Sequence, residues 1–150
     1  MREVTGVLKM LGSGKVTGNQ AGKSFVHYSS VEIGNEVLQK MRTAQALGDY
    51  ISRGLNNSGP ITLYIAGKLI IAVKLSDGKI YYWKRGITTV VFAVIAGPVF
   101  GSMAAGGSSY WMPAIFGAWL FFGLSLKSEL TQIFVHQPRF AALGGIPLKS

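Results

Sequence analysis

One short segment of the chain has residue types that could bind a phosphate group. Gly22-Lys23-Ser24 matches the end of the phosphate-binding loop, in which backbone N–H groups and a lysine hold the phosphates of a nucleotide. The full motif also requires a glycine at position 17, where this chain has Thr17, and a helix after the serine. The residues that follow favour a strand, so we interpret the segment as a glycine-rich turn.

The other candidate side chains do not form a group that could carry out chemistry. His27 and His136 are the two histidines of the chain, they lie in different segments, and the sequence contains no cysteine. Because metal sites need clustered ligands, we predict neither a metal site nor a cofactor. Glu32 and Glu36 flank a predicted hairpin turn, where exposed charges are commoner than an acid–base pair. We therefore expect no catalytic residues and a protein that is not an enzyme.

Residues 1–85 are predicted to form the β-structure that positions these side chains. Runs in which apolar and polar residues alternate are separated by turn residues, among them the hairpin signal Asp77-Gly78. Between the third and fourth runs, apolar residues at spacings of three and four predict an amphipathic helix. Thr43 is in position to cap its amino end, and residues 56–60 end it. The predicted strands cover residues 4–11, 24–33, 36–41, 61–66, 69–75 and 79–83.

An uncharged run follows this segment. From Gly86 to Leu126, 41 residues include no Asp, Glu, Lys, Arg or His. At ~1.5 Å per residue, a helix of that length would measure ~60 Å, about twice the hydrocarbon core of a bilayer. The small and polar residues 106–109 divide the run. We therefore predict a transmembrane helical hairpin with spans at about 87–105 and 110–126.

The predicted fold class is α+β. A small antiparallel β-domain with the order β-β-β-α-β-β-β comes first, and the two-helix transmembrane hairpin follows it. A helix within a set of curled antiparallel strands is similar in topology to small barrels such as the OB-fold, so a barrel-like arrangement is open to this domain. The predicted organisation is a cytoplasmic β-rich domain at 1–85, the hairpin at 86–126, and a cytoplasmic or interfacial tail at 127–150.

Two groups of residues are expected to hold the hairpin in place. Small residues four positions apart let another helix approach closely, and aromatic and cationic residues are typical of the membrane–water interface. The predicted helix-packing residues are Ala93, Gly97, Gly101 and Ala105. The predicted membrane-interface residues are Tyr81, Tyr82, Trp83, Lys84, Arg85, Tyr110 and Trp111.

The distribution of charge predicts where the protein lies. Residues 1–85 carry 12 Lys and Arg against 5 acidic residues, and the turn between the two predicted spans carries no charge. Under the positive-inside rule, both termini then face the cytoplasm. The expected localisation is therefore integral to the cytoplasmic (inner) membrane, with the tail either on the membrane, against the β-domain or disordered.

These features favour an adaptor over an enzyme. The leading hypothesis is a small inner-membrane protein whose β-domain binds or regulates a protein partner while the hairpin packs against another membrane subunit. A homo-oligomeric channel or membrane-permeabilising protein is the alternative, and a membrane-bound enzyme that needs a partner or cofactor is a third. The expected partners are the lipid bilayer and a membrane protein or further copies of this chain. Dispersed positive charges disfavour nucleic acid.

Overall fold

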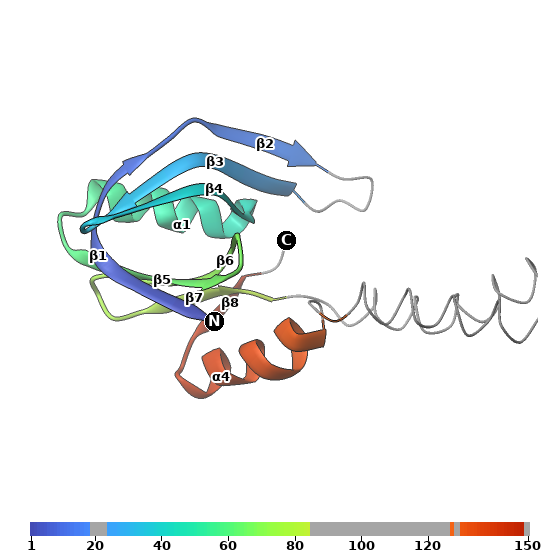
Figure 1. Ribbon diagram of the computed structural model, residues 1–150. Coiled ribbons are helices and arrows are strands. Elements are labelled where there is room, and N and C mark those ends of the chain that lie inside the picture. Colours follow the sequence, from blue (N-terminus) through green and yellow to red (C-terminus); the bar gives the residue numbers. More distant parts are fainter. Residues whose placement is uncertain (19–23, 85–126, 128–129, 149–150) are drawn as a thin grey trace, which may run out of the picture. The chain divides into compact units, whose positions relative to one another are not determined.

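The computed structural model describes residues 1–18, 24–84, 127 and 130–148 (Figure 1). The chain divides into two compact units, one made of residues 1–84 and 139–150 and the other of residues 85–138. The described part of the first unit is mostly β. Its strands are β1 (Arg2–Leu11), β2 (Gly14–Gly18), β3 (Ser24–Ile33), β4 (Glu36–Ala44), β5 (Pro60–Ala66), β6 (Leu69–Lys74), β7 (Ile80–Trp83) and β8 (Ile146–Leu148). The described helices are α1 (Gln45–Asn56), the π-helical turn η1 (Gln132–His136) and α4 (Gln137–Ala142).

Five of the strands close a barrel. β1 pairs antiparallel with β3 and β5, β3 pairs with β4, and β5 pairs with β6. Parallel pairing of β4 with β6, at Arg42–Leu69 and Thr43–Ile70, completes the circle. The interior is filled by fully buried aliphatic side chains, and α1 adds Leu47 and Ile51 to the same core. Burial of these side chains is the main driving force for closure.

A second apolar cluster lies outside the barrel, on β5, β6 and β7. β7 continues the sheet from β6, and β8 pairs parallel with β7. Phe140 of α4 is 1% exposed, and its ring centroid lies 5.0 Å from that of Tyr64 and 5.8 Å from that of Tyr82. Arg139 also donates a hydrogen bond to Glu3 on β1, at 3.1 Å. Residues 139–148 are therefore packed on the barrel, and Figure 1 shows α4 below the strands.

β1 and β2 follow each other along β3 as one bent strand. At the break between them, the Gly12 N–H donates to the Ser30 carbonyl at 2.8 Å, and the Ser29 N–H donates to the Ser13 carbonyl at 3.4 Å. Pairing of β2 with the first half of β3 then continues in regular register. A Cβ atom on Gly12 would lie 2.9 Å from the backbone nitrogen of Ser30, which cannot rotate away, so the bend favours glycine here.

Gly6 lets β1 pass the turn between β3 and β4, and its replacement by alanine is expected to destabilise the barrel. A Cβ atom on Gly6 would lie 2.7 Å from the Cα and N atoms of Gly34, whose N–H donates to the Val7 carbonyl at 2.9 Å. Because backbone atoms cannot rotate away, we expect Gly6→Ala to lower the free energy of unfolding by about 2 kcal/mol.

Urea denaturation followed by circular dichroism measures this change. The matched control is Gly18→Ala, because the nearest atom to a Cβ there is 4.0 Å away. The control should stay within about 0.5 kcal/mol of the parent protein. Equal midpoints for the two variants would contradict the close approach of β1 to the β3–β4 turn.

The predicted α+β fold with a transmembrane hairpin is corrected by the structure. The described fold is mostly β, and α1 and α4 have only 12 and 6 residues. Such helices measure about 18 and 9 Å, short of the ~30 Å hydrocarbon core. Across the described ranges, no helix is both long and apolar enough to cross a membrane. The predicted integral inner-membrane localisation is contradicted by the same finding, and the predicted spans, 87–105 and 110–126, lie outside the described residues.

Thr43 is not the helix cap that the sequence predicted. It belongs to β4, is fully buried, and its hydroxyl donates to the Ile70 carbonyl at 3.2 Å. The helix begins two residues later, after Ala44, without a side-chain cap. Pairing of β4 with β6 therefore extends the strand through Thr43, although a threonine before an apolar helical pattern is a common sequence signal for a helix N-cap.

Candidate functional site

Basic side chains from three neighbouring strands lie in one row on the outside of the barrel. Lys15 of β2 is paired with His27 of β3, which is paired in turn with Arg42 of β4. All three residues are exposed. Paired residues on neighbouring strands share a face with their Cβ atoms about 5 Å apart, so the row spans about 10 Å. Lys15 and Arg42 thus place two positive charges on one face of the sheet, where both can attract an anionic ligand.

The row continues to the turn between β5 and β6. The Arg42 N–H donates to the Lys68 carbonyl at 2.9 Å, and Lys68 follows Gly67, whose φ of 63° is left-handed. No described carboxylate forms an ion pair with a lysine or arginine of this row. Three of the five described acidic side chains pair elsewhere: Glu36 with Arg2, Asp77 with Lys79, and Glu3 with Arg139. We call Lys15, His27, Lys40, Arg42 and Lys68 the basic face.

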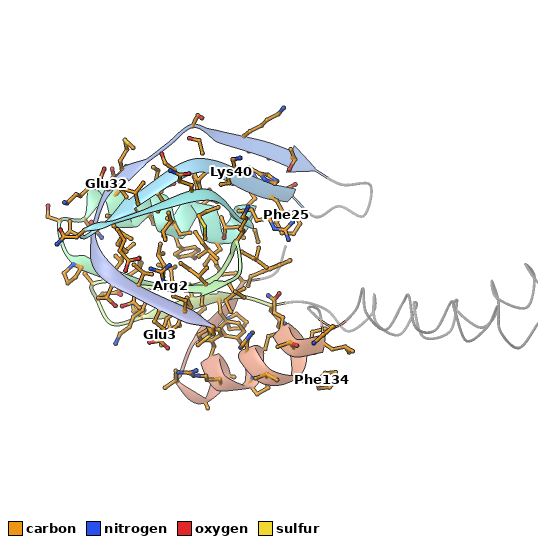
Figure 2. The ribbon with its side chains drawn as sticks, in the orientation of Figure 1. Arg2, Glu3, Phe25, Glu32, Lys40 and Phe134 are labelled. Atoms are coloured by element: carbon orange, nitrogen blue, oxygen red, sulfur yellow. The ribbon has the colours of Figure 1, made fainter. Side chains whose placement is uncertain are left out.

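A pocket of about 310 Å³ opens beside this row. It lies where two irregularities meet: the break between β1 and β2 at Ser13, and Lys40 of β4 with a left-handed φ of 54°. Figure 2 places Lys40 on the β3–β4 pair, away from Glu32 near the turn that joins these strands. The pocket is lined by Ser13, Lys15, His27, Tyr28, Ser29 and Lys40, with Met41 behind them.

Tyr28 belongs to the lining of the pocket, but its side chain points into the core of the barrel. Its side chain is 6% exposed, and burial raises the pKa of its phenol. The Asp49 carboxylate also raises this pKa, and a hydrogen bond with Ser52 lowers it. Ionised tyrosine is therefore disfavoured at this buried position. On the other side of the ring, Gly48 of α1 is close enough that a Cβ would lie 3.1 Å from the phenol oxygen.

A second, wider groove of about 580 Å³ lies between β4 and the amino end of β1. It shares Lys68 with the basic face and reaches Arg2, whose charge is paired with Glu36. Val37 on its wall is 59% exposed. Cations and an exposed aliphatic side chain thus occur together along this edge of the barrel.

The structure places four of the predicted membrane-interface residues in or beside β7. Tyr82 and Trp83 are 6% and 1% exposed, and Tyr81 stacks on Tyr50 with a centroid distance of 4.1 Å. Lys84 is exposed, and its N–H donates to the Leu148 carbonyl at 2.9 Å. The first unit thus uses these rings in its own packing. The other predicted interface and helix-packing residues, Arg85, Tyr110, Trp111, Ala93, Gly97, Gly101 and Ala105, lie outside the described residues and stay predictions.

The structure does not bring together the residues that the sequence analysis considered for phosphate or metal binding. Gly22 and Lys23 lie outside the described residues, and Ser24 begins β3. Among the residues that the structure describes, no group of three or more His, Cys, Asp or Glu could hold a metal ion. Sequence reasoning missed the basic face because it depends on the register of β2, β3 and β4. Within each strand, the only sequence signal for this face was a basic residue at a position that points outward.

Comparison with protein-family models, with curated proteins and with solved structures gave no match. The barrel is therefore described by its topology alone. A closed five-stranded barrel with a helix between its third and fourth strands has the topology of the OB-fold, in which the outer face of the second and third strands commonly binds ligands. In this chain those strands are β3 and β4, and they carry His27, Lys40 and Arg42.

Proposed function

We propose that the barrel is a binding module that docks a protein partner through an acidic surface. One observation carries this proposal: Lys15, His27 and Arg42 are aligned across three strands, and no described carboxylate forms an ion pair with them. Complementary charge speeds the encounter with an acidic partner and fixes its orientation. The accessory-subunit and channel roles that depend on a transmembrane hairpin are not carried forward.

A protein partner fits the basic face better than nucleic acid does. Sites for single-stranded nucleic acid combine cations with exposed aromatic rings on which the bases stack. Here Tyr28 is buried, and Phe25 makes an edge contact with Trp83 at 5.2 Å. The exposed apolar residue near the cations is instead Val37, which is 59% exposed and lines the groove that contains Lys68. Aliphatic contacts beside charged ones are typical of protein interfaces.

Single-stranded nucleic acid is the second candidate. The position of the basic face on the second and third barrel strands favours it, because this is where OB-fold proteins commonly bind oligonucleotides. The two candidates differ in the ligand that the same cations would hold, and they can be separated with defined probes.

Fluorescence anisotropy of the full-length protein with three probes tests the proposal. The probes are a peptide in which glutamate alternates with valine, the same peptide with glutamine in place of glutamate, and an oligothymidylate. We expect micromolar binding of the glutamate peptide that weakens as salt is raised, and little binding of the glutamine peptide. Tighter binding of the oligothymidylate would overturn the proposal in favour of nucleic acid. No binding of either anionic probe would contradict both candidates.

A further inference from the structure

We propose that the pocket between β2, β3 and β4 binds a phosphoryl group carried by a phosphorylated side chain of the partner. This inference rests on the proposed function and names the chemical group that the basic face selects. Three observations carry it: the set of donors that line the pocket, the backbone conformation at Lys40, and the size and openness of the pocket.

The donors match a phosphoryl group better than a carboxylate. Lys15 and Lys40 provide two ammonium groups, His27 provides a ring N–H, and Ser13 and Ser29 provide hydroxyls. The two serine oxygens are 3.4 Å apart and so form one wall. A phosphate monoester has about −1.5 to −2 charge at neutral pH and three terminal oxygens. A carboxylate has one charge and two oxygens, and it would leave part of this set without an acceptor.

The backbone brings the Lys40 side chain to this set. On β3 both Tyr28 and Val31 point into the core, and on β4 both Met41 and Leu38 do so. Two consecutive residues therefore face outward on each strand where strict alternation would allow one. On β4 this slip is accommodated by Lys40 in a left-handed conformation, which is uncommon for residues other than glycine. Such conformations gather at binding sites, where the placement of a side chain offsets the strain.

The pocket suits a group that remains attached to a chain. Its volume of about 310 Å³ exceeds what a phosphoryl group alone fills, and its walls come from three adjacent strands on the outside of the barrel. The neighbouring cation Arg42 lies in register with His27, so the acidic residues beside a phosphorylated side chain can pair along the row.

Titration with matched peptides tests the site. The glutamate–valine peptide is prepared with one central serine, either free or phosphorylated, and inorganic phosphate is titrated separately. We expect the phosphorylated peptide to bind at least about tenfold more tightly than the unphosphorylated one, because a charge-assisted pocket adds to the contacts of the row. Inorganic phosphate is expected to shift the NMR signals of the His27 ring.

Two variants locate the effect in the pocket. Lys40→Gly removes the ammonium group, and glycine adopts the left-handed conformation without strain. The variant should therefore have a higher melting temperature and bind the two peptides with about equal affinity. Lys9→Gly, on β1 and outside the pocket, should leave the preference unchanged. A preference that survives Lys40→Gly would overturn the assignment of the pocket.

The outcomes separate this inference from the proposed function. Equal affinity for the two peptides would overturn the phosphoryl site and leave the docking of an acidic partner intact. Shifts of the His27 signals by inorganic phosphate, without binding of either peptide, would support the pocket and contradict the proposed function. No response to any of the three probes would contradict both.

Discussion

Phe140→Ala is expected to lower the free energy of unfolding of the barrel unit by about 3–4 kcal/mol, the usual range for removing a fully buried aromatic side chain. Phe140 is 1% exposed and is the only described residue of α4 in the second apolar cluster. Its ring has an edge contact with Tyr64 and a stacked contact with Tyr82. Alanine would lose both aromatic contacts and leave a cavity against β5 and β7.

The effect should extend to β8. This strand has only three residues, and it follows α4 after the turn at Gly144, whose φ is 72°. The Gly145 N–H donates to the Phe140 carbonyl at 2.9 Å, so the turn is tied to the same helix. Without the Phe140 ring, the amide groups of β8 and their partners on β7 should exchange with solvent faster than those of β3 and β4.

Chemical denaturation and hydrogen exchange measure the two effects. Phe134→Ala is the matched control, because the Phe134 side chain is 61% exposed and its removal should change stability by no more than about 0.5 kcal/mol. Equal denaturation midpoints for the two variants would contradict the docking of α4. Loss of stability without faster exchange at β8 would show that the strand holds to β7 independently of the helix.

The strands that local pattern defines well were predicted from sequence. The predicted strand 24–33 is found as β3 with those bounds, and the predicted strand 61–66 differs from β5 by one residue. In both segments, β-branched and aromatic residues alternate with polar ones or are flanked by turn residues. The strand signal was therefore contained in a few consecutive residues.

The elements that sequence reasoning missed depend on partners far away in the chain. β2 has glycine at both ends and no buried residue, and it is a strand because it pairs with β3. β8 has three residues including Pro147, and it is a strand because it pairs with the free edge of β7. Neither segment has an apolar period of its own, so no window of the sequence could predict it.

The candidate site was missed for the same reason. Lys15, His27 and Arg42 are separated by 12 and 15 positions in the sequence, and dispersed charges of this kind read as a solvated surface. Their alignment follows from the register of three strands, one of which was not predicted. In the folded chain these charges are not dispersed, so dispersed charge no longer argues against nucleic acid. What still disfavours nucleic acid is that the basic face includes no Phe, Tyr or Trp on which a base could stack.

The double variant Lys15→Glu/Arg42→Glu is expected to weaken binding of the glutamate peptide by about 100-fold, or ~2.7 kcal/mol. The two substitutions flank His27 and reverse the charge at both ends of the row. Each one removes an attractive contact with the ligand and introduces a repulsive one, which is why the effect should exceed that of neutral substitutions.

The control is Lys9→Glu/Lys74→Glu, which changes the net charge of the chain by the same amount at exposed positions outside the basic face. Long-range attraction alone predicts that both double variants lose affinity equally, and at most a few-fold at physiological salt. A local site predicts a difference of at least about tenfold between them. Equal losses would therefore reject the basic face as the docking surface.

The stability of the Lys15→Glu/Arg42→Glu variant provides a further check on the same argument. In the parent protein, the positive charges of Lys15 and Arg42 lie on one face of the sheet on either side of His27, about 10 Å apart, and they repel each other weakly. Glutamate at both positions removes the two positive charges from this face, so the melting temperature should stay the same or rise while binding is lost. Residues that lower stability in the free protein and raise affinity for a ligand are expected where binding is the function. A variant that loses binding and stability together would point to a structural role for the row instead.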